Sequence, residues 1–112
     1  MTARKVRGAA TQGLVAAWFR AHGFPFCTDA GAGRSGRDLL NMIGLAPEVK
    51  ARADFSPLAW VRQARVNGDG DLPFVVLRCN GQGPTTVAEW PVIVPLDAFT
   101  SLLRMAGFGD PS

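Results

Sequence analysis

The stretch Asp38-Leu-Leu-Asn-Met-Ile-Gly44-Leu-Ala-Pro-Glu48-Val49-Lys50 decides how the fold of this chain is interpreted. Its two apolar runs meet at Gly44 and predict two consecutive strands. Because side chains alternate along a strand, Glu48 and Lys50 point to one face while Val49 points to the other. The spacing therefore predicts a carboxylate and an amine side by side on one face of a sheet, with Asp38 at the start of the preceding strand.

The segments around this stretch predict alternating helices and strands. Apolar residues at helical spacing predict helices over 8–22 and 56–66, and a closing helix follows Pro95. The predicted order is one helix, three strands, a second helix, two strands and a last helix. This order predicts the α/β class, with a mixed central β-sheet flanked by helices. The predicted strands are 24–28, 39–43, 45–51, 74–77 and 90–94.

Length and composition limit the architecture. The chain has 112 residues, of which 47% are hydrophobic and 19% charged, and these values suit one globular domain over 1–112. We expect flexible ends at 1–7 and 107–112. No apolar run approaches the roughly 20 residues that span a bilayer, and no signal peptide is recognisable. We therefore expect a cytoplasmic protein without a membrane partner.

Positive charge is concentrated in the first part of the chain. Residues 1–65 hold ten Lys or Arg against four Asp or Glu, whereas residues 66–112 hold two against five. A basic surface beside the quoted stretch is typical of a protein that binds phosphates. A solvated basic face without a ligand would have the same composition, so charge alone leaves both interpretations open.

The quoted stretch contains the donors of a divalent-metal site. A hard cation such as Mg²⁺ prefers oxygen ligands and keeps several waters, so the carboxylates of Asp38 and Glu48 can supply most of what the protein must provide. Lys50 beside such a cation could orient an attacking water and stabilise charge on a phosphate. The structural alternative is that Asp38 caps a turn while Glu48 and Lys50 form an exposed pair.

The whole pattern resembles the PD-(D/E)XK nuclease superfamily, and within it the Holliday junction resolvases of archaea and phages. The resemblance covers most of the chain. It is carried by a first helix ending in Ala21-His22-Gly23-Phe24, the loop Gly33-Arg-Ser-Gly-Arg-Asp38, the core Glu48-Val49-Lys50 and a helix from Ser56. It implies a metal-dependent endonuclease that hydrolyses DNA phosphodiesters and leaves a 5′-phosphate. Such an enzyme would be encoded by a phage or would belong to a bacterial or archaeal cell.

The resemblance also assigns roles to residues. Asp38 and Glu48 would be metal ligands, Val49 would lend its main-chain carbonyl, and Lys50 would be the catalytic lysine. Ser35 would lie near the scissile phosphate. The implied cofactor is Mg²⁺, with Mn²⁺ able to substitute.

Two glutamines are further candidates. Resolvases of this kind commonly carry a Glu on the first helix that contacts the metal, and Gln12 is the nearest residue here. An amide carbonyl can bind a metal but lowers the ligand charge. Gln63 lies on the helix after the catalytic strand, where related nucleases often carry a Gln at the site, and it could equally be an ordinary surface residue.

DNA would be the partner, as four-way junctions or other branched DNA. A four-way junction has two-fold symmetry and needs paired cuts, so we expect a C2 homodimer. The residues expected to contact DNA are Arg34, Ser35 and Arg37 beside the site, and Arg4, Lys5, Arg7 and Arg52 around it.

Two features depart from the family pattern and keep alternatives open. Gln12 replaces the helical Glu, and Pro47 stands in an expected interior strand, where a bulge or a wrong strand assignment would explain it. One alternative is a less structure-specific DNA endonuclease of the same superfamily. The other is a catalytically weakened DNA-binding or adaptor domain of the same fold.

Overall fold

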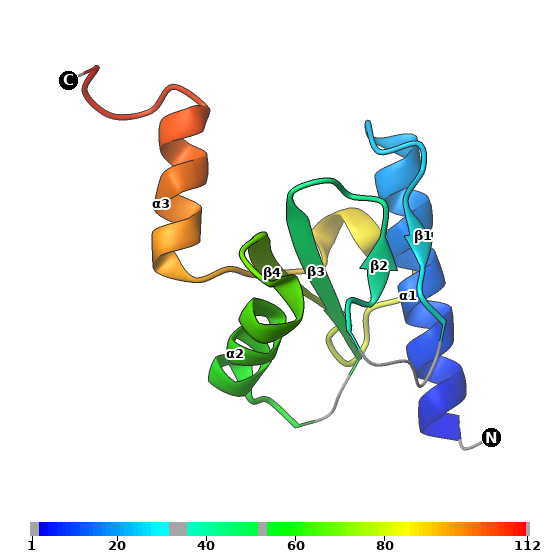
Figure 1. Cartoon of the computed structure of the whole chain (residues 1–112). Coiled ribbons are helices and arrows are strands. Elements are labelled where there is room, and N and C mark those ends of the chain that lie inside the picture. Colours follow the sequence, from blue (N-terminus) through cyan, green and yellow to red (C-terminus); the bar gives the residue numbers. More distant parts are fainter. Residues whose placement is uncertain (1–2, 32–35, 52–53, 112) are drawn as a thin grey trace.

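The computed structural model describes residues 3–31, 36–51 and 54–111, with residues 3–7 described by their backbone alone. The helices and strands follow the predicted order, with a 3₁₀ helix added between the last two strands, and the chain is of the mixed α/β class (Figure 1). None of the described helices is long and apolar enough to cross a bilayer. The elements are α1 (Ala3–Ala21), β1 (Thr28–Asp29), β2 (Leu39–Leu40), β3 (Leu45–Lys50), α2 (Pro57–Gly68), β4 (Leu72–Leu77), the 3₁₀ helix η1 (Pro84–Glu89), β5 (Val92–Ile93) and α3 (Leu96–Met105).

The strands form two small sheets in the described part of the chain, where the sequence predicted one central sheet. β1 and β2 pair antiparallel. The second sheet has the order β3-β4-β5, in which β4 is parallel to β3 and antiparallel to β5. Helix α2 is the crossover that a parallel pair requires. The second sheet is therefore mixed, as predicted, but it is smaller than expected.

The outer edge of β3 explains why the sheet ends there. The carbonyl of Gly44 accepts a hydrogen bond from the N–H of Leu72, and the carbonyl of Lys50 accepts one from the N–H of Arg78. The backbone N–H and C=O groups of the even-numbered residues of β3 therefore point toward β4. The backbone N–H and C=O groups of the odd-numbered residues point away from β4, to the outer edge of β3. Pro47 has no N–H to offer on that side, and the N–H of Val49 donates to Asp38. Pro47 thus stands at an edge, where its missing N–H costs no ladder bond.

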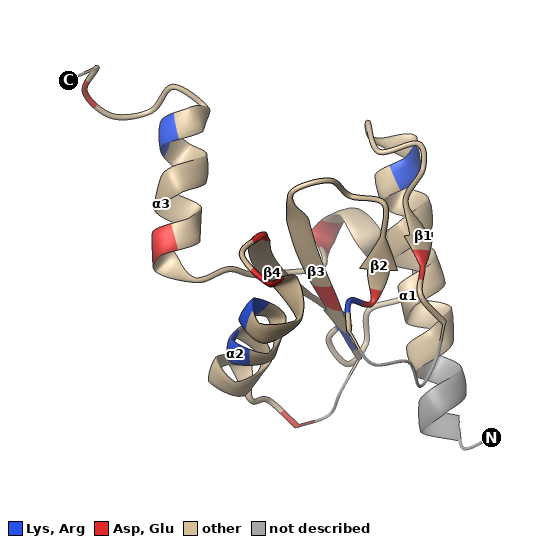
Figure 2. Cartoon of the chain, viewed as in Figure 1, with Lys and Arg blue, Asp and Glu red and all other residues tan. Residues whose placement is uncertain are grey.

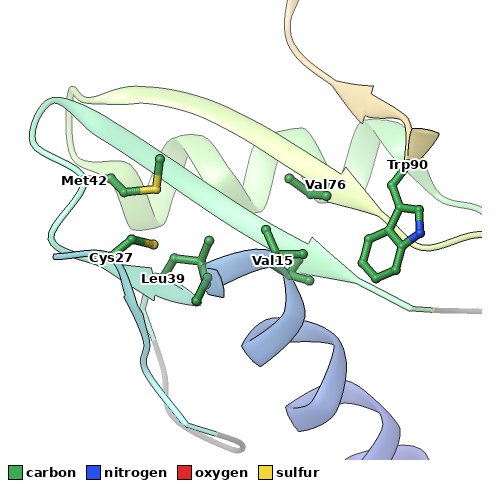
Figure 3. Close-up of a cluster of buried hydrophobic side chains, with 8 residues drawn as sticks. Val15, Cys27, Leu39, Met42, Val76 and Trp90 are labelled. Atoms are coloured by element: carbon green, nitrogen blue, oxygen red, sulfur yellow. The ribbon is translucent and has the colours of Figure 1, made fainter. Parts of the chain in front are cut away.

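The larger core lies between α1 and one face of the β3-β4-β5 sheet (Figure 3). Val15 and Ala16 of α1 pack there against Val49 and Val76, which alternate onto this face of their strands. The remaining buried residues of this core are Cys27, Leu39, Met42 and Trp90. Because Val49 is anchored in this core, its neighbours Glu48 and Lys50 are directed to the opposite face.

A second core lies between α2 and that opposite face. Trp60 and Ala64 of α2 pack against Val75 and Leu77 of β4. At the end of α2, Gly68 is buried and a Cβ added to it would lie 2.6 Å from the Cβ of Ala46. This close approach brings the last turn of α2 onto β3, beside Glu48.

The helix boundaries differ from the predicted ones. α1 begins at Ala3 instead of Gly8, so at least residues 3–7 of the expected flexible N-terminus are helical. α2 continues to Gly68 and ends at Asp69, which has a left-handed backbone with φ 46°. Asn67 is therefore helical, although the predicted helix ended at residue 66.

Helix α3 stands apart from both cores (Figure 1). None of its residues is buried, although its sequence is strongly amphipathic. An ion pair between Arg65 and Asp97 connects it to α2. The sequence predicted a helix here and predicted it correctly, but its apolar face lies largely in solvent.

Candidate active site

The segment before β2 and the end of β3 meet around one carboxylate. The Oδ2 atom of Asp38 accepts a hydrogen bond of 2.7 Å from the backbone N–H of Val49. Figure 2 shows the acidic segment of β3 next to the charged segment that precedes β2. The predicted neighbourhood of Asp38 and the Glu-x-Lys strand is therefore present, and Asp38 is held there by the backbone.

Glu48 is the most buried charged residue among those described, with 2% of its surface exposed. Its Oε1 accepts a hydrogen bond of 2.8 Å from the side-chain amide of Asn67. Burial raises the pKa of Glu48 from 4.5 to about 7, the Asn67 amide opposes the rise, and the charge and hydrogen bonding of Asp38 add to it. Asp38 and Glu48 are therefore neighbouring carboxyl groups, and Glu48 takes up a proton at a higher pH than an ordinary glutamate.

Lys50 lies on the same face of β3 as Glu48, as the alternation predicted. Its Nζ donates a hydrogen bond of 2.9 Å to Oε1 of Gln63 on α2. Both side chains reach the solvent, Gln63 more than Lys50. Gln63 is therefore a neighbour of the candidate lysine and not an isolated surface residue, which keeps open the role that its position on the helix predicted.

Asn67 is a residue of this site that the sequence analysis missed. It lies four residues after Gln63 and seven after Trp60, so all three lie on the side of α2 that faces the β3-β4-β5 sheet. This spacing was visible in the sequence. It was overlooked because Asn67-Gly68 resembles a turn, whereas the helix includes both residues.

Arg37 fixes the segment that carries Asp38. Its guanidinium donates to the carbonyls of Gly68 at 2.6 Å and Leu45 at 3.2 Å. It also donates to the carbonyl of Asn67 at 3.4 Å and pairs with Asp71 at 2.7 Å. These contacts join the segment before β2 to the end of α2 and the start of β3. These contacts occupy the guanidinium of Arg37 within the fold, and its predicted contact with DNA stays a prediction.

Gln12 lies on α1, which packs on the other face of the sheet. Its Oε1 is buried and has no hydrogen-bond partner among the described residues. Within the same part of the chain, no hydrogen bond joins it to Asp38, Glu48 or Lys50. Its predicted role as a replacement for a helical Glu stays a prediction.

Several predicted DNA contacts cannot be placed. Arg34, Ser35 and Arg52 lie outside the described residues, and the side chains of Arg4, Lys5 and Arg7, on the first turns of α1, are not described. Their predicted roles stay predictions.

The donors that are present suit a divalent cation with a large share of water ligands. Over the ranges 3–31, 36–51 and 54–111, no group of three or more His, Cys, Asp or Glu side chains could hold a metal. The remaining donors are the carboxylates of Asp38 and Glu48 and the main-chain carbonyl of Val49. This carbonyl lies on the outer edge of β3, because the C=O and the N–H of a strand residue point to the same side. Mg²⁺ is commonly held by one or two carboxylates plus waters, so this donor set fits that ion. The raised pKa of Glu48 is consistent with the same interpretation, because a bound cation would compensate the carboxylate charge that burial disfavours.

Comparison of the chain with protein-family models, with curated proteins and with solved structures found no match. The assignment of the site therefore depends on its own residues and geometry.

Proposed function

We propose that this protein is a metal-dependent endonuclease that cleaves DNA. The observation that carries the proposal is the pairing of Asp38 with the buried Glu48, two residues before Lys50 on the same strand face. Burying two carboxyl groups together is costly unless a proton or a cation compensates their charge. The structural alternative, in which Asp38 caps a turn and Glu48 and Lys50 form an exposed pair, would not require burial of Glu48.

Asp38, Glu48 and the Val49 carbonyl would hold Mg²⁺ or Mn²⁺. A bound cation of this kind lowers the pKa of its water and offsets the charge that develops on a phosphate during hydrolysis. Asp38 keeps one oxygen on the Val49 N–H, which leaves its other oxygen for the metal. Asn67 orients the Glu48 carboxylate in the same way, through a hydrogen bond to Oε1.

Lys50 supplies the positive side chain closest to these carboxylates along β3. Gln63 holds its ammonium group at 2.9 Å and so restricts where it can point. From there, Lys50 would orient the water that attacks the phosphorus atom and stabilise the added negative charge. Both residues reach the solvent, the side from which a DNA backbone would approach.

Within this class we propose branched DNA, and four-way junctions in particular, as the substrate. This part of the proposal rests on the sequence resemblance and on the basic charge of residues 1–65. The runner-up is an endonuclease of the same superfamily with less preference for DNA structure.

The test is cleavage of a labelled four-way junction, a flap and a linear duplex, with Mg²⁺ and with EDTA. We expect cutting with Mg²⁺ only, and its loss in Glu48→Ala and in Lys50→Ala, while both variants still bind the junction. Glu89→Ala is the matched control, because Glu89 is the other glutamate of the chain and is exposed.

Each other outcome identifies an alternative. Cleavage that persists in either site variant refutes the mechanism. A junction preference below about tenfold, or ~1.4 kcal/mol, favours the less specific endonuclease. Salt-sensitive DNA binding without any cleavage by the wild type favours the adaptor domain.

A further inference from the structure

Arg78 follows the last residue of β4 and lies beside the candidate active site. Its backbone N–H donates a hydrogen bond of 2.8 Å to the carbonyl of Lys50, across the pair of parallel strands. Neighbouring strands lie about 4.8 Å apart, so the two residues are adjacent at the carboxyl end of the sheet. Leu77 belongs to the core under α2, and the alternation along β4 therefore turns Arg78 to the α1 face. Lys50 and Arg78 thus lie on opposite faces of the same end of the sheet.

Three neighbours orient the guanidinium of Arg78. Its Nε donates to the carbonyl of Gln82 at 2.9 Å, and its Nη1 donates to the hydroxyl oxygen of Thr11 on α1 at 3.2 Å. Its Cζ atom lies 5.4 Å from the ring centroid of Trp90, which is within the range of a cation–π contact. Figure 3 shows this tryptophan at the carboxyl ends of β3 and β4. The loop after β4, helix α1 and the residue after η1 therefore hold the side chain of Arg78 in one direction.

These contacts leave the positive charge of Arg78 uncompensated. The Thr11 hydroxyl and the Gln82 carbonyl are neutral, and no ion pair within residues 3–31, 36–51 and 54–111 includes Arg78. In the same ranges its Nη2 has no hydrogen-bond partner. Arg37 differs in this respect, because its Nη2 pairs with Asp71. A half-buried charge without a counter-charge is costly, so an arginine fixed in this way is suited to an anion that binds from outside the fold.

We propose that Arg78 binds a backbone phosphate of the DNA beside the phosphate that is cut, an inference that rests on the proposed function. The guanidinium presents its N–H donors in a rigid fork that matches phosphate oxygens. Lys50 acts at the scissile phosphate on the α2 face, and Arg78 lies on the α1 face. The DNA strand therefore crosses the carboxyl end of β3 and β4 from one face of the sheet to the other. Arg78 fixes the direction in which this strand enters the site, as phosphate contacts generally position a nucleic acid.

The test measures binding of a labelled four-way junction by fluorescence anisotropy in EDTA, at salt concentrations from about 50 mM to about 200 mM. Each phosphate contact contributes about −0.9 to the slope of the logarithm of the binding constant against the logarithm of the salt concentration. Arg78→Gln should therefore make this slope shallower by about 1 and weaken binding at the lowest salt by about tenfold. Arg78→Lys keeps the charge but not the fork, so it should keep the wild-type slope and lose part of the affinity.

Arg104→Gln is the matched control, because it removes the same charge from an exposed position of α3 and should leave the slope unchanged. Arg78→Met is a second neutral variant whose apolar side chain can still cover Trp90, and it should lose the same slope as Arg78→Gln. Thermal unfolding shows that each variant is folded. An unchanged slope in either folded neutral variant overturns the proposal and leaves the proposed function intact, since Arg78 then only links α1 to η1. A wild type that binds no junction refutes the proposed function itself and, with it, the role of Arg78.

Discussion

Replacing Glu48 by glutamine should remove the main pH dependence of folding in the metal-free protein. The pKa of Glu48 is about 7 in the fold against an ordinary value of 4.5. The folded state therefore binds more protons than the unfolded state between these values. The stability that Glu48 contributes is greatest below pH 4.5 and is lost as the pH rises through 7. With about 1.36 kcal/mol for each pKa unit, the loss by pH 8 is about 3 kcal/mol.

The glutamine side chain of the E48Q variant cannot ionise, but it keeps the shape of Glu48. Its carbonyl can still accept the Asn67 hydrogen bond, and its NH₂ can donate to Asp38 in place of the Glu48 proton. Above pH 7, E48Q should therefore be more stable than the wild type by up to about 3 kcal/mol, or about 10 °C in melting temperature. Below pH 4.5 the two proteins should unfold at similar urea concentrations.

The assay is urea unfolding in EDTA, followed by tryptophan fluorescence, at intervals from pH 4 to pH 8. The wild-type free energy of unfolding should decline across this range, and the curve of E48Q should be flatter by the stated amount. E89Q, which removes the exposed glutamate, should retain the wild-type slope. If E48Q and the wild type show the same pH dependence, the pKa of Glu48 is not raised in the fold, and the reasoning that links it to a cation fails.

Three further substitutions test the surroundings of this pair. Asn67→Ala should raise the pKa of Glu48 further, because the hydrogen bond that opposes the rise is lost. The free energy of unfolding at pH 8 should therefore fall by about 1–3 kcal/mol. An unchanged dependence of the free energy of unfolding on pH in Asn67→Ala would contradict this. Arg37→Ala should lower the free energy of unfolding in urea by about 2–3 kcal/mol, because three carbonyls and Asp71 lose a charged donor. Arg62→Ala, at an exposed position of α2, should lower it by under about 0.5 kcal/mol. Equal effects of the two substitutions would refute the role of Arg37 in holding these segments together. Gly68→Ala should cost about 1–3 kcal/mol because its Cβ meets Ala46 at 2.6 Å, and a neutral effect would show that α2 can shift away from β3.

The sequence predicted the parts of the fold that local patterns determine. Strand alternation placed Glu48 and Lys50 on one face, because this depends only on the two-residue period of a strand. Ser56-Pro57 correctly predicted the start of α2, since proline is favoured at the first helical position. The meeting of Asp38 with the Glu-x-Lys strand came from the family pattern, because spacing alone does not fix which strands adjoin.

The parts that the sequence did not predict depend on contacts between distant segments. Arg37 was predicted to contact DNA because it flanks the site, and this stays a prediction. The three carbonyls from two other elements that converge on its guanidinium are not visible in the local sequence. Asn67 was left out of the predicted helix because Asn67-Gly68 resembles a turn, whereas in the fold the helix includes both residues and Gly68 packs closely on Ala46. The exposure of α3 was hidden for the same reason: an amphipathic pattern predicts an apolar face but not what covers it.

The outer edge of β3 gives Asp38 a second consequence beside its place in the site. An open strand edge with free N–H groups is a template on which another chain can add a strand, and such addition leads to aggregation. On β3 this template is disabled, since Pro47 lacks an N–H and the Val49 N–H is bonded to Asp38. The carboxylate that would hold a catalytic cation thus also protects the edge of β3 from uncontrolled association.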